Sequence, residues 1–390
     1  MSRWREHILN LKIENITLSI FELPSNTGQF TLVQETRGAQ RRWTRRHHST
    51  GTGELHVLHV RTDEGIEGVC TVGGARYTTM RRQDLEQLRI LATGEDPLDR
   101  ERLNGKLAAA TRGLFAKAGW FGAFDNCLWD IAGKAACLPV WGLLGRARAS
   151  CPAYYNYGGA TQEAAVESAI SALDLGFTAL KDHFRSTPNE NINWSRAVRA
   201  AVGPDVDLLA DHVMAGYTFV EALRVGRALQ DLHFGWFEEP LPDAEIVQLQ
   251  KLCGALDLPV MALETMMHDH ALCAQYVLLG ATDLVRANAR HGTTGLLKLA
   301  HLAEAHGRRI ELNGPGGLFG LVHAHLVCAL RNTSYYEYFP GGSRDEAGKA
   351  IGLLNPPVPI NGHIAPPDTP GWGAEWDWEW FRMHRVAELR

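Results

Sequence analysis

The chain has 390 residues, of which 45% are hydrophobic and 21% are charged, and its formal net charge at pH 7 is −5. This length allows one large domain with a smaller one beside it, and the composition is that of a folded globular protein. The mild acidic excess argues against a dedicated nucleic-acid-binding protein, which usually carries a basic surface. We therefore expect no nucleic-acid partner.

Neither a targeting segment nor a membrane helix is predicted. The first twenty residues interleave charged and apolar side chains and lack the uninterrupted apolar core of a secretory signal. No apolar run approaches the roughly 18 residues that a membrane helix needs. The seven cysteines are odd in number and include no CxxC pair, which favours reduced thiols over disulfides or a zinc site. We expect a cytoplasmic protein with no membrane partner.

The N-terminal part, up to about residue 140, predicts an α+β domain. Alternating apolar and polar positions indicate strands at residues 13–23 and 55–61. Helical patterns follow at residues 81–91 and 98–110, and strands followed by helices are typical of an α+β arrangement. Between the first strands lies a basic stretch that we expect to be a loop, with Arg41, Arg42, Arg45, Arg46, His47 and His48. Such a loop forms either a solvated surface or a source of cations for an anionic substrate.

Beyond residue 140, short apolar strands alternate with amphipathic helices. The expected strands cover residues 153–157, 178–180, 207–210, 234–237 and 259–263. The expected helices cover residues 163–175, 194–202, 218–229 and 244–256. This alternation implies parallel strands joined by crossover helices.

One polar or charged residue per repeat follows the apolar strands, and these residues are Lys181, Asp211, Glu238, Glu264, Asn288, Asn313 and Glu337. Successive members are 24 to 30 residues apart. This spacing suits one strand–helix unit of a barrel, since eight units take roughly 250 residues. Side chains at the ends of parallel barrel strands meet at the C-terminal mouth. The sequence therefore predicts an α/β barrel with a ring of active-site groups.

Asp211, Glu238 and Glu264 place three carboxylates on consecutive strands. Converging carboxylates repel one another strongly unless a cation is bound. Oxygen ligands without Cys or His favour Mg²⁺ or Mn²⁺ over zinc. Any one of these acids alone would be interpreted as an ordinary strand-end residue. Three acids at the ends of three consecutive strands predict a metal site.

Lys181 and His183 are two residues apart, so that a strand would direct both toward the barrel interior. A partly desolvated lysine beside a divalent cation acts as a base when its pKa is lowered. Two alternatives stay open. In the first, Lys181 is not a base but a structural partner of Asp211 or Glu238. In the second, His183 is not a base but a core residue that forms hydrogen bonds.

Four motifs extend the pattern, namely residues 119–134 (GWFGAFDNCLWDIAGK), 176–181 (GFTALK), 236–240 (WFEEP) and 258–264 (LPVMALE). Together they resemble the enolase superfamily, in particular its mandelate racemase-like branch. The resemblance implies a modified (β/α)7β TIM-like barrel in residues 141–360. It also implies an N-terminal α+β capping domain in residues 1–140, which we expect the C-terminal tail 361–390 to close.

The resemblance implies one Mg²⁺ per active site, held by Asp211, Glu238 and Glu264. It further implies that a base removes the proton α to the carboxylate of a small-molecule substrate, giving an enediolate that the metal stabilises. Lys181 and His183 are the candidate bases. Glu337 matches a position that often hydrogen-bonds the intermediate in such enzymes.

Two departures from the family pattern bear on the reaction. Asn288 and Asn313 stand where many members carry an Asp–His dyad, and an amide cannot accept a proton at neutral pH. This loss counts against a two-base racemase and favours a dehydratase, in which Lys181 or His183 acts from one face. We expect Asn288 and Asn313 to bind substrate instead.

Further substrate contacts are expected from Tyr157, at the end of the first barrel strand, and from the basic stretch, through Arg45, His47 and His48. Guanidinium groups suit carboxylates, and His47 or His48 would supply a second acid. The predicted function is therefore dehydration of an acid sugar, an aldonate or aldarate, to a 2-keto-3-deoxy acid.

The alternatives are an epimerase, racemase or lactone cycloisomerase on the same scaffold, and a metal-binding protein without catalysis. In the C-terminal tail, Trp376, Trp378 and Trp380 alternate as in a strand. We expect them to pack against the cap or another subunit, and we expect a homo-oligomer.

Overall fold

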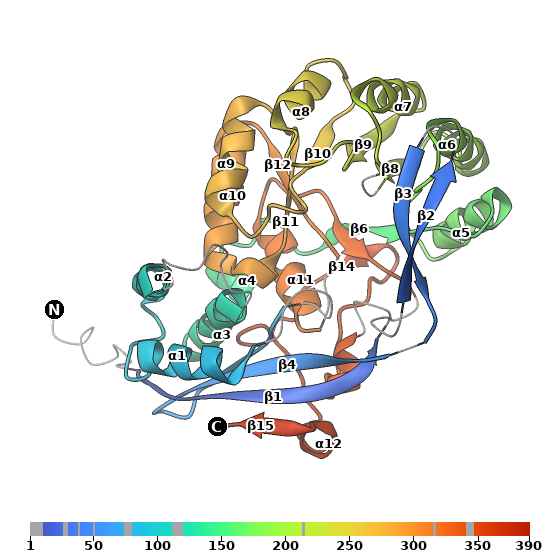
Figure 1. Ribbon diagram of the computed structural model, residues 1–390. Coiled ribbons are helices and arrows are strands. Elements are labelled where there is room, and N and C mark those ends of the chain that lie inside the picture. The colour runs from blue at the N-terminus through green and yellow to red at the C-terminus, as the bar shows by residue number, and fades with distance from the viewer. Residues whose placement is uncertain are drawn as a thin grey trace.

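The computed structural model describes residues 11–25, 30–37, 40–49, 51–73, 80–110, 120–212, 215–314, 317–340 and 347–390. These residues form an antiparallel sheet with helices, a β-hairpin and a parallel barrel (Figure 1). Among them, no helix is both long enough and apolar enough to cross a membrane.

The cap is an antiparallel sheet with helices packed on it. Its strands are β1 (Ile13–Ser25), β4 (Gly51–Thr62), β5 (Glu67–Thr71) and β15 (Ala387–Leu389), in the order β15-β1-β4-β5. Its helices are α1 (Arg82–Ala92), α2 (Arg100–Ala110), α3 (Trp120–Ala135) and α4 (Val140–Leu143). Leu85 and Leu88 of α1 belong to the same buried core as Ile16 and Leu18 of β1. The C-terminal strand β15 thus forms one edge of the sheet and pairs with β1, the first strand of the chain.

Within the described residues, eight parallel strands curl into the barrel, with β13 beside β6. They are β6 (Cys151–Asn156), β7 (Ala179–Lys181), β8 (Asp207–Asp211), β9 (Phe234–Glu238), β10 (Val260–Ala262), β11 (Leu284–Ala287), β12 (Arg309–Leu312) and β13 (Tyr336–Tyr338). The helices between them are α5 (Gln162–Asp174), α6 (Pro188–Val202), α7 (Phe219–Asp231), α8 (Ile246–Cys253), α9 (His270–Leu279), α10 (Thr293–Ala305) and α11 (Phe319–Ala329), with a 3₁₀ turn η1 (Ala289–His291) before α10. This architecture confirms the predicted (β/α)7β barrel with an α+β cap.

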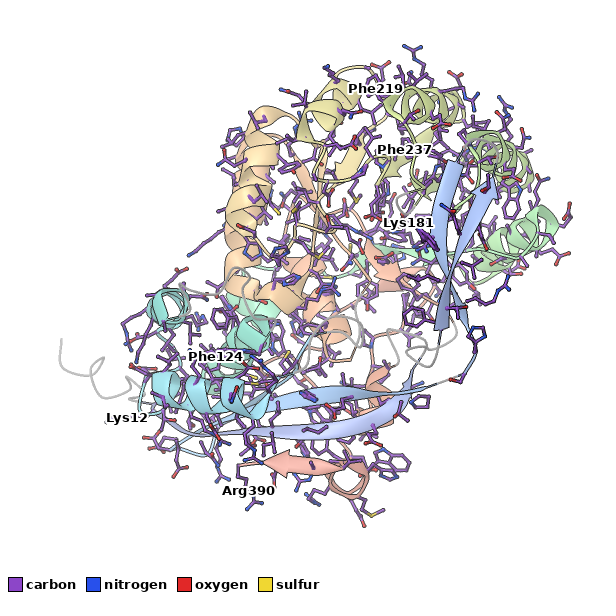
Figure 2. The ribbon with its side chains drawn as sticks, viewed as in Figure 1. Lys12, Phe124, Lys181, Phe219, Phe237 and Arg390 are labelled. Carbon is purple, nitrogen blue, oxygen red and sulfur yellow. The ribbon has the colours of Figure 1, made fainter. Side chains whose placement is uncertain are left out.

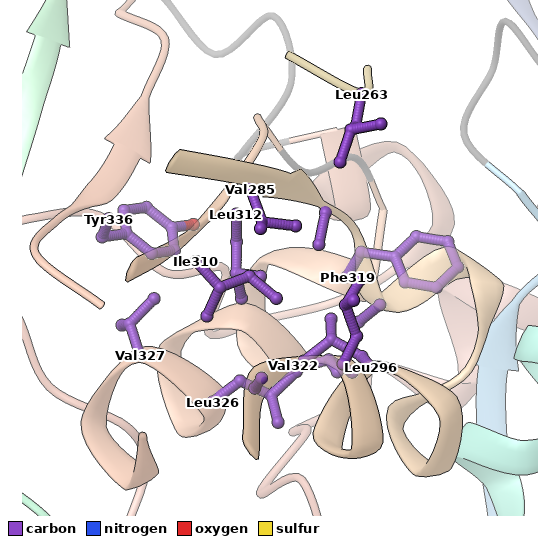
Figure 3. Close-up of a cluster of buried hydrophobic side chains, with 14 of the residues drawn as sticks. Leu263, Val285, Leu296, Ile310, Leu312, Phe319, Val322, Leu326, Val327 and Tyr336 are labelled. Atoms are coloured by element: carbon purple, nitrogen blue, oxygen red, sulfur yellow. The ribbon is translucent and has the colours of Figure 1, made fainter. Parts of the chain in front are cut away.

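Apolar side chains on the outer face of the barrel hold the helices in place. Figure 3 shows Val285 of β11 and Ile310 of β12 facing Leu296 of α10 and Val322 of α11, all of them buried. Full burial of one such side chain stabilises the fold by about 1.5–3 kcal/mol. Alternate strand residues are therefore committed to this layer, which leaves the others to line the barrel interior.

The prediction of a loop for the basic stretch 41–48 is wrong. Most of it lies in β3 (Gln40–His47), which pairs antiparallel with β2 (Phe30–Arg37). Leu32 and Trp43 of this hairpin are exposed. None of the side chains described in β2 is buried, and a strand without a buried face lacks the alternation of apolar and polar residues by which strands are recognised in sequence.

The strand-like reading of the tail tryptophans is also wrong, because α12 (Trp378–His384) is a helix whose N-cap is Asp377. The rings of Trp376 and Trp378 stack with centroids 5.2 Å apart, and the Phe381 ring lies 4.9 Å from that of Phe21 in β1. The tail therefore packs on the cap of its own chain. The remaining tail elements are η2 (Ala347–Ile351) and β14 (His363–Ile364).

His325 of α11 connects the barrel to the cap-closing segments. Its Nδ1 accepts a hydrogen bond from Trp141 N at 3.1 Å, and its Nε2 donates one to Trp372 O at 3.1 Å. Burial lowers the pKa of His325 to about 3, so that the ring is neutral in the folded protein.

We expect His325 to make the protein sensitive to acid. The unfolded chain binds a proton at this histidine near pH 6.5, whereas the folded chain does so only near pH 3. The free energy of unfolding should therefore fall as the pH drops below 6.5, by up to about 1.4 kcal/mol per pH unit from this group. Urea unfolding at about pH 5 and about pH 7 should show a shallower pH dependence for His325→Gln than for the wild type. Equal pH dependence in the two proteins would contradict this role.

Candidate active site

The barrel interior changes from apolar to charged along its strands. A buried apolar cluster inside the barrel contains Tyr154, Ala179, Leu209, Trp236, Met261 and Leu284. Two residues further along five of these six strands stand Asn156, Lys181, Asp211, Glu238 and Arg286. Since side chains on one face of a strand recur every two residues, both layers point inward. The charged layer therefore rests on an apolar floor.

Strand β10 departs from this period of two. The residue two positions after Met261 is Leu263, whose φ of 89° lies in a region that bulky side chains rarely adopt. The Leu263 side chain is fully buried in the core (Figure 3). Oε2 of the next residue, Glu264, lies 3.4 Å from Arg286 Nε. The unusual backbone turn thus brings an acid to the charged layer.

Asp243, in the loop after β9, holds this turn from both sides. Its Oδ1 accepts a hydrogen bond from Leu263 N at 2.7 Å. Its Oδ2 accepts hydrogen bonds from Thr265 N at 2.9 Å and Thr265 Oγ1 at 2.6 Å. Asp243 is itself buried. It therefore fixes the residues on either side of Glu264.

Replacing Asp243 with Ala should release the strained turn. Loss of three hydrogen bonds to a buried carboxylate should lower the free energy of unfolding by roughly 2–4 kcal/mol. The matched control is Asp269→Ala, because Asp269 accepts bonds from Ala271 N and Leu272 N only as the N-cap of α9. That variant should cost about 1 kcal/mol. Equal losses in urea denaturation would contradict a special role for Asp243.

Lys181 lies at the centre of the charged layer and is fully buried; Figure 2 shows it among the barrel strands. Its Nζ lies 2.9 Å from Glu238 Oε2, 2.9 Å from Glu337 Oε1 and 3.2 Å from Asp211 Oδ2. Burial and the charge of Arg286 favour the neutral amine, but Glu238 and Glu337 outweigh them and hold the pKa of Lys181 above its usual value. Lys181 is therefore a cation in this arrangement.

Arg286 of β11 is the second buried cation of the layer, and sequence reasoning missed it. Its Nε lies 2.7 Å from Glu238 Oε1, its Nη2 lies 2.7 Å from Glu337 Oε2, and its Nη1 donates to Tyr154 OH at 3.2 Å. A signal was present, because Arg286 is two residues before Asn288 and so shares its face of the strand. Together with Lys181 it holds the pKa of Glu337 well below the usual range, despite burial.

The described side chains of this layer carry more negative than positive charge. Four carboxylates, those of Asp211, Glu238, Glu264 and Glu337, face the two permanent cations Lys181 and Arg286, so the layer has an excess of 4 − 2 = 2 negative charges when all four are ionised.

The pKa values reflect this excess. Burial, together with repulsion from Asp211 and Glu264, raises the pKa of Glu238 to about 8 although Arg286 and Lys181 oppose it. Burial and the same two acids raise the pKa of Glu239 to about 9. The site is therefore short of positive charge.

His183 lies nearer to solvent than Lys181. Its side chain is 31% exposed, whereas that of Lys181 is 0% exposed. Its Nε2 lies 3.3 Å from Asp211 Oδ2, and this contact helps Lys181 to lower the pKa of Asp211 against the effect of burial. Of the two candidate bases, His183 is thus the accessible one.

The structure brings Asn288 and Asn313 together at the ends of β11 and β12, where Asn288 Nδ2 donates a hydrogen bond to Asn313 Oδ1. Tyr157 does not join the charged layer. Its ring packs at 5.8 Å against Phe184, in the core between strands and helices. Asn156 reaches the layer instead, since its Nδ2 lies 3.4 Å from Glu337 Oε1.

Of the three substrate contacts predicted in the basic hairpin, only His48 has a described side chain. His48 is exposed, with its Nε2 2.9 Å from Thr31 Oγ1. The side chains of Arg45 and His47 lie outside the described residues. Their expected contacts with substrate remain predictions.

A cavity of about 600 Å³ lies elsewhere, between the start of α2 and α10. Arg100, Trp129 and Lys298 are among its lining residues, and the Arg100 guanidinium lies 4.0 Å from the centroid of the Trp129 ring. Its lining includes none of the residues of the charged layer. The charged layer is the better candidate, because it combines uncompensated charge with residues from seven barrel strands.

The side chains of the charged layer suit a hard divalent cation. Asp211, Glu238 and Glu264 offer only oxygen, which Mg²⁺ prefers, and the layer holds more carboxylates than permanent cations. Glu238 Oε1 is buried and accepts no hydrogen bond of good geometry from the described residues. In the described part of the chain, however, no three His, Cys, Asp or Glu side chains are already arranged to hold a metal ion. Lys181 and Arg286 lie between these carboxylates.

Comparison with known families agrees with this geometry. Residues 164–380 match the family described as enolase C-terminal domain-like, which is more than half of the chain. Residues 33–145 match the mandelate racemase / muconate lactonizing enzyme N-terminal domain. The chain belongs to the enolase superfamily. Both matches place it in the mandelate racemase-like branch, as the sequence motifs predicted.

Two curated relatives illustrate the enzymes of this branch. The chain is 28% identical over 303 residues to the L-talarate/galactarate dehydratase of Salmonella typhimurium, covering 73% of this chain and 72% of the relative. It is 27% identical over 391 residues to the 3,6-anhydro-alpha-L-galactonate cycloisomerase of Streptomyces coelicolor, covering 96% and 99% of the two chains. The prediction of an enzyme of this superfamily is confirmed, and named dehydratases support its placement among the hydro-lyases.

A solved structure shows the same fold with a metal ion. The D-glucarate dehydratase of Agrobacterium tumefaciens, in complex with magnesium, superposes with a TM-score of 0.81 at 28% identity. The match covers 96% of this chain and 99% of that one. A close structural relative of this chain therefore binds the cation that the sequence predicts here.

Proposed function

We propose that this enzyme removes water from an acid sugar, an aldonate or aldarate, in a reaction that depends on a divalent cation and gives a 2-keto-3-deoxy acid. The observation that carries the proposal is the buried layer in which four carboxylates face only two permanent cations. A divalent cation balances that excess, and a substrate carboxylate then binds beside it. The named dehydratases among the relatives support the substrate class.

Asp211, Glu238 and Glu264 would hold the cation, for which Mg²⁺ is the expected identity. When bound, it would stabilise the negative charge that develops on the substrate carboxylate as the α-proton leaves. Asp243 keeps Glu264 in place for this purpose. The apolar floor below the layer keeps water away from these carboxylates and strengthens their interactions.

We assign removal of the α-proton to His183, whose imidazolium then returns that proton to the β-hydroxyl as it leaves as water. The imidazole is partly exposed and histidine is the side chain most often used as a general base, whereas Lys181 is buried and contacts three carboxylates. Lys181 then orients Asp211, Glu238 and Glu337. Asn288 and Asn313 bind substrate hydroxyl groups as a hydrogen-bonded pair, since neither amide accepts a proton.

The proposal is tested with purified protein, Mg²⁺ and a panel of aldonates and aldarates, with keto-acid formation as the readout. One or more members should turn over, and chelation of the metal should stop the reaction. His183→Asn should lower kcat by about 10²–10⁴-fold, because general-base catalysis is worth that much. No turnover across the panel, with the metal bound, would contradict a dehydratase.

A cycloisomerase is the second candidate, because the Streptomyces coelicolor relative matches along 96% of this chain. The mass of the product separates the two reactions. A dehydratase converts an open-chain acid sugar to a product lighter by one water, whereas a cycloisomerase converts an anhydro acid to a product of unchanged mass. His183→Asn should slow either reaction.

A further inference from the structure

Arg286 occupies the position from which a metal ion would contact two of its proposed ligands. Its guanidinium is 1% exposed, and Nε lies 2.7 Å from Glu238 Oε1 and 3.4 Å from Glu264 Oε2. Mg²⁺ binds carboxylate oxygens at about 2.0–2.1 Å. If a cation lay at that distance from both acids while the Arg286 Nε kept its present place, two positive charges would be in close contact.

The two ends of the guanidinium have different partners. Nε faces Glu238 and Glu264, whereas Nη2 lies 2.7 Å from Glu337 Oε2 and Nη1 lies 3.2 Å from Tyr154 OH. The Nη contacts involve neither of the two proposed metal ligands. The guanidinium can therefore keep its contacts with Glu337 and Tyr154 when its Nε contacts are broken.

We propose that Arg286 is the resident counter-ion of the metal site, and that a divalent cation binds only by displacing its Nε from Glu238 and Glu264. The inference rests on the proposed function, in which these acids are metal ligands. It implies that Arg286 stabilises the metal-free barrel and weakens the affinity for the metal. Metal binding and retention of these Arg286 contacts exclude each other.

Removal of Arg286 alone would also change the total charge of the site, so the design needs a charge-matched variant. Arg286→Met combined with Glu337→Gln removes one cation and one anion. The excess of negative charge remains two, as three carboxylates then face Lys181. This double variant isolates the local competition from the overall charge, and it leaves no buried Glu337 carboxylate without its arginine.

Titration calorimetry with Mn²⁺ and Mg²⁺ tests the inference directly. The double variant should bind either ion at least about tenfold more tightly than the wild type, because the competing cation is gone. Glu337→Gln alone retains Arg286 and should bind no more tightly than the wild type. Arg290→Met is the arginine control, since Arg290 lies four residues further on and its Nη2 lies 3.5 Å from Met267 Sδ.

Circular dichroism and thermal unfolding establish that each variant is folded, and Arg286→Lys replaces the double variant if that protein does not fold. The shorter lysine should also raise the affinity, by a smaller factor. An unchanged or weaker affinity in the double variant, with the wild type binding the metal, would overturn the inference and leave the proposed function standing. Absence of divalent-cation binding in every variant would overturn both.

Discussion

The structure depends on the balance of charge inside the barrel. Parallel strands bring the buried Asp211, Glu238 and Glu337 to one layer, where the turn after β10 adds the partly exposed Glu264, and burial of carboxylates is costly unless cations accompany them. Lys181 and Arg286 supply part of that compensation through contacts of 2.7 to 3.4 Å. The remaining negative charge is what makes the layer a binding site rather than a structural ion-pair network.

The cap is fixed to the barrel by the buried helix α3, which contains the longest of the family motifs. Asp125 Oδ2 accepts a hydrogen bond from Thr294 N at 2.8 Å, and Asn126 Nδ2 donates to Ala289 O at 2.9 Å. Asp130 Oδ1 accepts a bond from Trp372 N at 2.9 Å. One helix thus joins η1, α10 and the C-terminal tail, and so holds the region around Asn288 in register with the cap.

Much of this arrangement was predictable, because strand period and repeat length are properties of the sequence. The spacing of 24 to 30 residues predicted Lys181, Asp211, Glu238 and Glu337 as one ring, and in the structure each of the three carboxylates lies within 3.2 Å of Lys181 Nζ. Helix α6 was predicted too short, although the capping box formed by Thr187 and Glu190 marks its true start at Pro188.

Other features depend on three-dimensional context. Arg286 has the sequence pattern of an ordinary strand residue, and only the convergence of β9, β13 and the turn after β10 gives it three carboxylates. The positive φ of Leu263 is imposed by Asp243, twenty residues earlier, and no local pattern announces it. Asn156 is the last residue of β6, and Tyr157 comes directly after it. Because neighbouring residues point to opposite faces, the Tyr157 side chain lies in the helix layer and not in the barrel interior.

The most direct test is a crystal structure of the protein grown with Mn²⁺, examined by anomalous scattering. We expect one anomalous peak within bonding distance of carboxylate oxygens of Asp211, Glu238 and Glu264, with the Arg286 guanidinium moved away from Glu238 toward Glu337. A peak at another site, or no peak with Arg286 still in contact with Glu238, would contradict this expectation.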